Sequence, residues 1–135
     1  MRHAYLASAV LVAVLWIGSV SVAQTPATQP EELKLAPIPA AWGAGVTNAQ
    51  LIDRPEVRVL RVDMAANGVR NVHAHDEMQY HLFIPTSAGM RLEPEGQAPI
   101  DVPGWQVQFI KGGTRHGFRN MGTSTVSVLE VFVRK

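Results

Sequence analysis

The chain has 135 residues, with 12 lysines and arginines against 11 aspartates and glutamates, and it contains no cysteine. This length suits one small domain, and a nearly neutral chain without a run of basic residues argues against nucleic acid as a partner. The absence of cysteine excludes disulfides and thiolate metal ligands, so the fold must depend on its core, a bound metal or a subunit interface.

Residues 1–23 have the features of a secretory signal peptide. A short polar start with Arg2 precedes the almost wholly apolar run 4–20, and Ser21 and Ala23 supply the small residues that a cleavage site requires. We therefore expect cleavage near Ala23 and export to the periplasm or the medium, with no stable membrane insertion afterwards. The alternative is an uncleaved segment that anchors the chain, since residues 5–23 are long enough to span a bilayer.

Residues 24–45 are predicted to form a Pro-rich arm or linker. The segment is rich in Pro, Thr, Ala and Gln and shows no usable periodicity. Such composition is typical of a tether or of an arm that lies over a domain. The folded domain is then expected to occupy residues 46–135.

From residue 46 onward the pattern is that of short β-strands separated by turns. Residues 57–64 alternate between two faces, and Asn67-Gly68 marks a turn after them. Further strands are expected at 80–84, 90–93, 99–102, 105–110 and 125–133, with a hairpin turn at 94–97. Short strands at this spacing, without a sustained helical period, predict an all-β sandwich or barrel.

Four of the five histidines lie in two short segments with the character of a metal site: His73, His75, His81 and His116. In a strand, His73 and His75 point to the same side, and a histidine from a different strand can complete one face of a coordination sphere. Imidazole nitrogens bind zinc, iron, nickel and copper, and three protein ligands leave a position open for water or substrate.

These two segments resemble the two motifs of the cupins, small β-barrels of jelly-roll (double-stranded β-helix) type. In the second motif Gly104 stands first, and the spacing from Gly113 to His116 and on to Asn120 is that of the family. The first motif matches at the His-x-His of residues 73–75. The resemblance covers residues 46–135 and implies a cupin-type barrel.

By that resemblance, four residues hold a divalent ion (Fe, Mn, Zn or Ni) inside the barrel: His73, His75, Gln79 and His116. Gln79 stands where the family has an acidic ligand, so the site keeps an oxygen donor and loses a negative charge. The chain also departs from the family at Gly68, one residue too close to His73, in the missing closing glycine and at Lys111, which replaces a proline. A barrel that keeps the histidines without taking a metal is the alternative.

His81 and Glu77 are the candidate catalytic residues. In a continuous strand His81 shares its face with Gln79, which places it beside the metal as a partner of the ligands or as an acid or base. The opposite parity leaves both residues outside. Glu77 is a candidate general base or reserve oxygen ligand, and its alternative is a solvated surface carboxylate.

The leading hypothesis is an exported cupin that acts as a mononuclear metal-dependent enzyme, of dioxygenase, isomerase or lyase type, on a small organic molecule. The alternatives are a non-catalytic periplasmic module that binds a small ligand or metal, and an interaction domain with a vestigial site. Arg115 and Arg119 flank His116 and are candidates to receive an anionic substrate. Small cupins often pair, and the apolar residues on both faces of 80–84 favour a homodimer.

Overall fold

Short alternating segments form one antiparallel β-sheet in the computed structural model, which describes residues 33–135. The strands are β1 (Ala36–Pro37), β2 (Gly43–Asp53), β3 (Val57–His73), β4 (Met78–Pro85), β5 (Met90–Pro94), β6 (Ile100–Val102), β7 (Gln108–Lys111), β8 (His116–Asn120) and β9 (Val126–Arg134), with a 3-10 turn, η1 (Ala40–Trp42), before β2. The expectation of an all-β fold is confirmed. Within these residues, no helix has the length and hydropathy needed to span a bilayer.

The expected signal peptide, 1–23, and residues 24–32 of the expected arm lie outside the described residues. The rest of the arm, 33–45, takes part in the sheet. β1 pairs with β2, with Ala36 opposite Asn48, and β2 already begins at Gly43. This part of the arm therefore lies against the domain.

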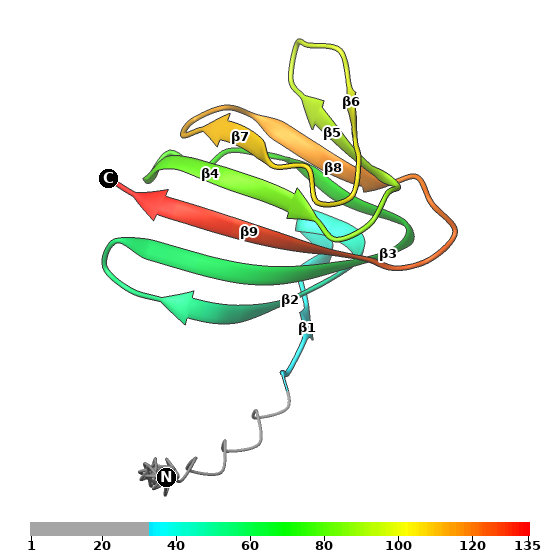
Figure 1. The fold of residues 1–135 in the computed structure, drawn as a ribbon, viewed down its shortest axis with the longest axis horizontal. Helices are drawn as coiled ribbons and strands as arrows, with labels where there is room; N and C mark the ends of the chain where they lie inside the picture. Colours follow the sequence, from blue (N-terminus) through cyan, green and yellow to red (C-terminus); the bar gives the residue numbers. More distant parts are fainter. Residues whose placement is uncertain (1–32) are drawn as a thin grey trace, which may run out of the picture. The chain divides into compact units, whose positions relative to one another are not determined.

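The long strand β3 joins the two halves of the sheet (Figure 1). The strand order is β6-β5-β8-β3-β9-β4-β7, and β2 pairs with β3. Residues 57–64 of β3 pair with β9, and residues 69–73 pair with β8. One strand thus contributes side chains to both halves.

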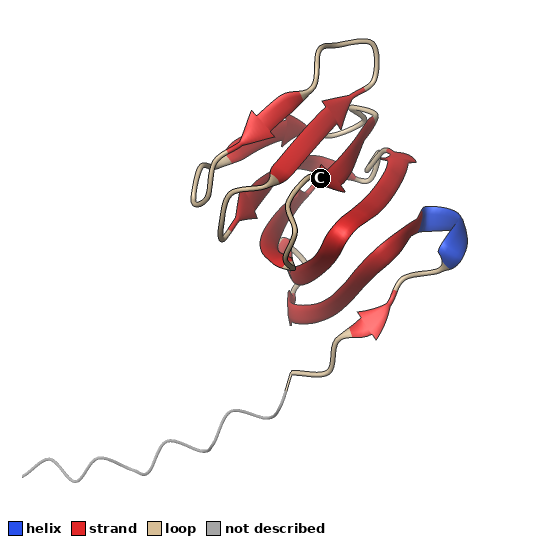
Figure 2. Ribbon diagram, turned by 90° about the vertical axis from the view of Figure 1, so that its right-hand side faces the viewer, coloured by secondary structure: helices blue, strands red, loops and turns tan. Residues whose placement is uncertain are grey.

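The sheet curls so far that its two halves share one core. Phe83 on β4 and Phe118 on β8 are separated by β9 and β3 in the strand order, yet their rings stack with centroids 4.2 Å apart. Every strand from β2 to β9 contributes buried side chains to this core: Val46, Met64, Phe83, Met90, Leu92, Val102, Ile110, Phe118, Val126 and Val128. Figure 2 shows the curl from the side. The sheet is therefore a nearly closed barrel, held by apolar burial.

The turn expected at Asn67-Gly68 is wrong, because β3 continues through both residues. Asn67 has φ 59°, a left-handed conformation that asparagine adopts more readily than most residues. A Cβ on Gly68 would lie 2.8 Å from the carbonyl oxygen of Ala65 and 2.9 Å from that of Gly45. The Asn-Gly pair therefore marks the bend at which β3 leaves β9 and joins β8.

The other expected strands agree with the structure. β4 contains the segment expected at 80–84, β9 covers 126–134 where 125–133 was expected, and the expected hairpin joins β5 to β6. β7 begins at Gln108, three residues later than expected. Trp105 has φ 63°, a turn conformation that no regular strand contains.

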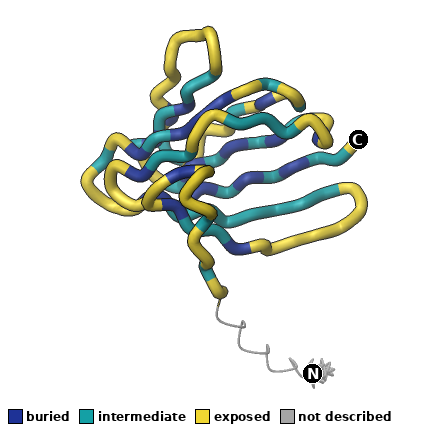
Figure 3. The backbone as a smooth tube through the Cα atoms, turned by 180° about the vertical axis from the view of Figure 1, so that it is seen from behind, coloured by how far each residue is buried: buried dark blue, intermediate teal, exposed yellow. Residues whose placement is uncertain are grey.

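Register across the barrel places charged groups inside it. Buried and partly exposed positions alternate along the strands (Figure 3), and on β9 the buried positions are Val126, Val128, Glu130 and Phe132. Phe132 lies between Arg58 on β3 and His81 on β4, while Glu130 lies between Leu60 and Phe83. These rows of side chains face the interior.

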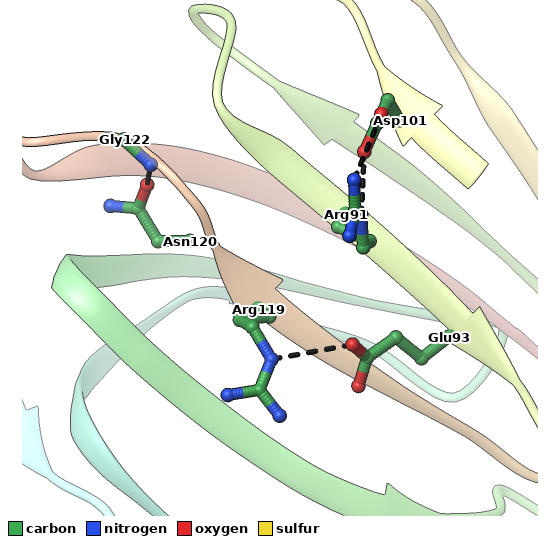
Figure 4. Close-up of polar contacts among 6 residues, drawn as sticks. All are labelled: Arg91, Glu93, Asp101, Arg119, Asn120 and Gly122. Carbon is green, nitrogen blue, oxygen red and sulfur yellow. Dashed lines mark hydrogen bonds and ion pairs between the residues drawn. The ribbon is translucent and has the colours of Figure 1, made fainter. Parts of the chain in front are cut away.

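Asn120 fixes the loop that follows β8. Its side chain is fully buried, and its Nδ2 donates to the carbonyl oxygens of Met64, Ala65 and Ser124 at 2.8–3.0 Å. Its Oδ1 accepts a hydrogen bond from the backbone N–H of Gly122 at 2.9 Å (Figure 4). The position that matched the end of the second motif thus has a structural role.

Candidate metal centre

Three histidines converge where β3 ends and β8 begins. His73 is the last residue of β3 and lies opposite His116, the first residue of β8, in the register of the two strands. His75 follows in the loop before β4. One ring nitrogen from each of the three lies within 4.8 Å of the others. The i, i+2 spacing and a distant strand therefore bring these rings together, as the sequence indicates.

Backbone carbonyls orient two of the rings. Nδ1 of His73 lies 2.7 Å from the carbonyl oxygen of Asn71, and Nδ1 of His116 lies 2.7 Å from that of Thr114. Because a carbonyl only accepts, each Nδ1 carries the proton and each Nε2 keeps a lone pair. Metal-ligating histidines commonly have this second hydrogen bond, which fixes the tautomer and the direction of the ring.

The inner nitrogens lack protein partners. Nε2 of His75, His81 and His116 is buried in each case and forms no hydrogen bond. A buried polar atom left unsatisfied is costly, so several at one point indicate a ligand that the protein is built to hold. A donor set of neutral imidazoles fits a divalent transition metal.

A β-bulge at Gln79 decides which residue of β4 joins the cluster. Met78 lies opposite Arg134 of β9 and Tyr80 lies opposite Val133, so β4 has one extra residue between them. The expectation that Gln79 and His81 share one face is therefore wrong, since a bulge reverses the parity of all that follows. Gln79 is exposed and is not brought to the cluster.

His81 is 1% exposed and belongs to the inner face. Its ring centroid lies 5.0 Å from that of His116 and 5.2 Å from that of His75. On its other side the ring stacks on Phe132, with centroids 4.9 Å apart. His81 is thus a fourth imidazole that borders the cluster of His73, His75 and His116.

Burial keeps the imidazoles neutral. Desolvation, together with the neighbouring histidines and arginines, lowers the pKa of His73 to about 4 and that of His75 to about 3. The same main cause lowers the pKa of His81 and of His116. Neutral rings are the form that binds a metal, so the cluster needs no deprotonation at neutral pH.

Glu77 lies at the edge of the cluster. Its side chain is 62% exposed, and Oε1 is 4.0 Å from Nδ1 of His75. It is therefore near one imidazole of the cluster and mostly in solvent.

A cavity of about 430 Å³ opens beside the histidines, a volume that suits a small organic molecule. His73 and His75 line it together with apolar side chains that include Leu60, Phe83 and Phe118. Three charged residues also line it: Arg58, Arg70 and Glu130. None of these three was singled out from the sequence.

Glu130 is the buried acid of this cavity. Desolvation raises its pKa to about 7, although Arg70 and Arg58 oppose the shift. In the sequence, Glu130 alternates in step with Val126 and Val128, and this pattern was the signal that could have placed it on the inner face. That signal was ambiguous, because Leu129, Val131 and Val133 make the opposite face of β9 at least as apolar.

The arginines that flank His116 in the sequence point away from the cavity. Arg115 pairs with Glu95 at 2.8 Å. Arg119 pairs with Glu93 at 3.3 Å, and Figure 4 shows this second pair. Both are about half exposed. The structure thus assigns the cationic side of the cavity to Arg58 and Arg70.

No family model matches this chain, and no curated protein matches its sequence. Solved structures match its fold. The polyketide cyclase RemF from Streptomyces resistomycificus has a TM-score of 0.67 at 20% identity, over 77% of this chain and 75% of that one.

Two further structures match over most of their length. A predicted oxalate decarboxylase from Thermotoga maritima has a TM-score of 0.69 at 18% identity, over 77% of this chain and 95% of that one. An RmlC-like cupin from Shewanella frigidimarina has a TM-score of 0.65 at 14% identity, over 80% and 89%. The chain has the cupin fold.

Proposed function

We propose that the chain is an exported metal-dependent enzyme that acts on a small organic molecule. The main evidence for this proposal is the convergence of three imidazoles, whose ring nitrogens lie within 4.8 Å of one another, beside a cavity of about 430 Å³. Further support comes from the buried, unpartnered Nε2 atoms of His75, His81 and His116.

In this proposal His73, His75 and His116 hold the ion, and His81 takes the fourth position that the family resemblance gave to Gln79. A bound divalent ion supplies Lewis-acid polarisation of an oxygen atom of the small molecule. The protein keeps the rings neutral by burial and directs two of them through Asn71 and Thr114.

The names of similar structures favour an enzyme over a binding module. One is a polyketide cyclase and another a predicted oxalate decarboxylase. Both names describe chemistry on small organic molecules. Dioxygenase, isomerase and lyase reactions are all compatible with the site.

The test is a product search by mass spectrometry. Metal-loaded protein is incubated with a panel of small carboxylates, diketones and phenols, with His116→Ala and Arg119→Gln in parallel. We expect a product that forms with the wild type and Arg119→Gln and falls at least a hundredfold with His116→Ala. If a compound binds the metal-loaded protein tightly and is recovered unchanged, the protein is a binding module and the proposal of an enzyme is wrong.

We also propose that the mature protein is a homodimer. On the outer face, one apolar row crosses five strands of the sheet: Phe109, Leu82, Val131, Val59 and Ile52. Phe109 is 64% exposed and Ile52 is 45% exposed. An exposed apolar row of this kind can pack on its own copy about a two-fold axis, and a single copy would leave it in water.

Native mass spectrometry of the exported protein reports both export and pairing. We expect chains that begin at Gln24, in dimers, and we expect Phe109→Glu to give monomers. Met121→Glu is the matched control, since Met121 is 49% exposed and lies outside the row. Monomeric wild type, or a chain that keeps residues 1–23, would refute the corresponding half of the prediction.

A further inference from the structure

Glu130 places a carboxyl group among apolar side chains inside the barrel. It lies between Leu60 and Phe83 in the register of β3, β9 and β4, and it is only 8% exposed. Among the described residues, neither Arg58 nor Arg70 forms an ion pair with it within 4.0 Å. Burial of an unpaired carboxyl is costly, and proteins keep such groups mostly where they act.

Arg58 brings a partly buried cationic group to the same cavity. Its guanidinium carbon lies 4.7 Å from the centroid of the Phe132 ring, and its Nε is buried without a hydrogen-bond partner. Stacking on an aromatic ring fixes the plane of the guanidinium and leaves its edge available. Arg58 therefore has a donor inside the barrel that no protein group satisfies.

Arg70 brings a second cation from the other half of β3. Its guanidinium carbon lies 5.3 Å from the centroid of the Trp42 ring, and its Nη1 donates to the carbonyl oxygen of Trp42 at 3.0 Å. Among the described residues it has no carboxylate partner within 4.0 Å. Both arginines are close enough to Glu130 to lower its pKa.

The cavity therefore has more positive than negative charge, even without a metal. Two guanidinium groups stand against one carboxyl, while Phe83 and Phe118 supply apolar walls. Planar guanidinium groups match a carboxylate in geometry and charge, and the apolar walls match a hydrocarbon portion. A small organic anion fits both features, whereas an inorganic anion would leave the walls without a partner.

We propose that this cavity binds a small organic carboxylate through Arg58 and Arg70, and that the carboxyl of Glu130 limits how strongly it binds. This inference rests on the proposed function, because it names the substrate class of the same site. The arginines nevertheless act without the ion, so the binding of the anion can be measured separately from metal binding and turnover.

The test uses benzoate and its uncharged isostere benzamide as probes, titrated by calorimetry into the protein as purified and after chelation. We expect benzoate to bind on the order of tenfold or more tightly than benzamide in both forms, because only benzoate forms charge-assisted hydrogen bonds. Equal affinities, or no binding of either probe at millimolar concentration, would overturn the inference. If the protein prefers benzoate but binds no metal, the inference about the anion site stands and the proposed metal-dependent function fails.

Five variants, one of them a surface control, test which residues produce the effect. Arg58→Gln and Arg70→Gln should each weaken benzoate binding on the order of tenfold and leave benzamide unchanged, whereas the surface control Arg119→Gln should have no effect. Arg58→Lys keeps the positive charge and controls for loss of folding. Its affinity for benzoate should lie between those of the wild type and Arg58→Gln. At pH 8, Glu130→Gln should tighten benzoate binding several-fold, since it removes a competing negative charge. If Arg119→Gln loses as much affinity for benzoate as the cavity variants, the assignment to Arg58 and Arg70 is wrong. If Glu130→Gln does not bind benzoate more tightly, the role given to Glu130 is wrong.

Discussion

Addition of a divalent ion to the chelated protein should raise its unfolding temperature, and His116→Ala should abolish that rise. An ion that binds only the folded state at a hundred times its Kd stabilises it by about 2.7 kcal/mol, which for a domain of this size is on the order of 10 °C. His116 supplies a buried Nε2 that no protein group satisfies. The measurement is differential scanning calorimetry with Fe²⁺, Mn²⁺, Zn²⁺ and Ni²⁺ in turn.

The matched controls separate the two candidate fourth ligands. Gln79→Ala should keep the full rise in temperature because Gln79 is exposed, while His81→Ala should lose much of it. The rise on adding the ion is compared within each variant, so the effect of each substitution on the metal-free fold cancels. A loss confined to Gln79→Ala would contradict the assignment made from the bulge.

Glu130→Gln should remove the dependence of stability on pH that Glu130 itself contributes. Its pKa is raised from 4.5 to about 7 in the folded protein, so between these values the folded state holds a proton that the unfolded state has lost. Stability from this group is therefore fully present below pH 4.5 and is lost as pH rises through about 7. The loss is on the order of 3 to 4 kcal/mol, from about 1.4 kcal/mol per pKa unit.

The measurement is urea unfolding of the chelated protein at pH 4.5, 6 and 8. At pH 8 we expect Glu130→Gln to exceed the wild type in free energy of unfolding by that amount, and at pH 4.5 to match it. The buried histidines contribute with the opposite sign, and they cancel in the difference because both proteins contain them. Glu95→Gln, on the surface beside Arg115, is the control. Parallel pH profiles for the wild type and Glu130→Gln would refute the prediction.

The strands and the pairing of His73 with His75 follow from local rules. Alternation along a strand puts side chains two residues apart on one side, so His73 and His75 could be paired from spacing alone. The hairpin at 94–97 and the strand at 125–133 follow from turn residues and β-branched residues in the same way. His116 needed the resemblance to the cupins, because its partner strand is distant in sequence.

The exchange of Gln79 for His81 could not be predicted, because the bulge depends on a tertiary contact. A Cβ on Gly112 would lie 1.8 Å from the carbonyl oxygen of Met78, and the N–H of Gly112 donates to the carbonyl of Gln79 at 2.9 Å. This close approach fixes the extra residue in β4. Nothing in the residues of β4 alone indicates it.

Glu130 was missed for a different reason. The barrel has apolar side chains on both surfaces of β9, so alternation shows two faces without saying which is inner. A carboxyl on either face is expected to point to solvent until the strands that pair with β9 are known. The same outer apolar surface that conceals Glu130 is the one proposed to pair two chains.

A crystal structure of the metal-loaded protein, with anomalous data at the absorption edge of the ion, tests the metal centre most directly. We expect one strong anomalous peak among the Nε2 atoms of His73, His75 and His116, with His81 completing the set and Gln79 in solvent. The absence of a peak after loading, or a peak held by surface carboxylates instead, would contradict it.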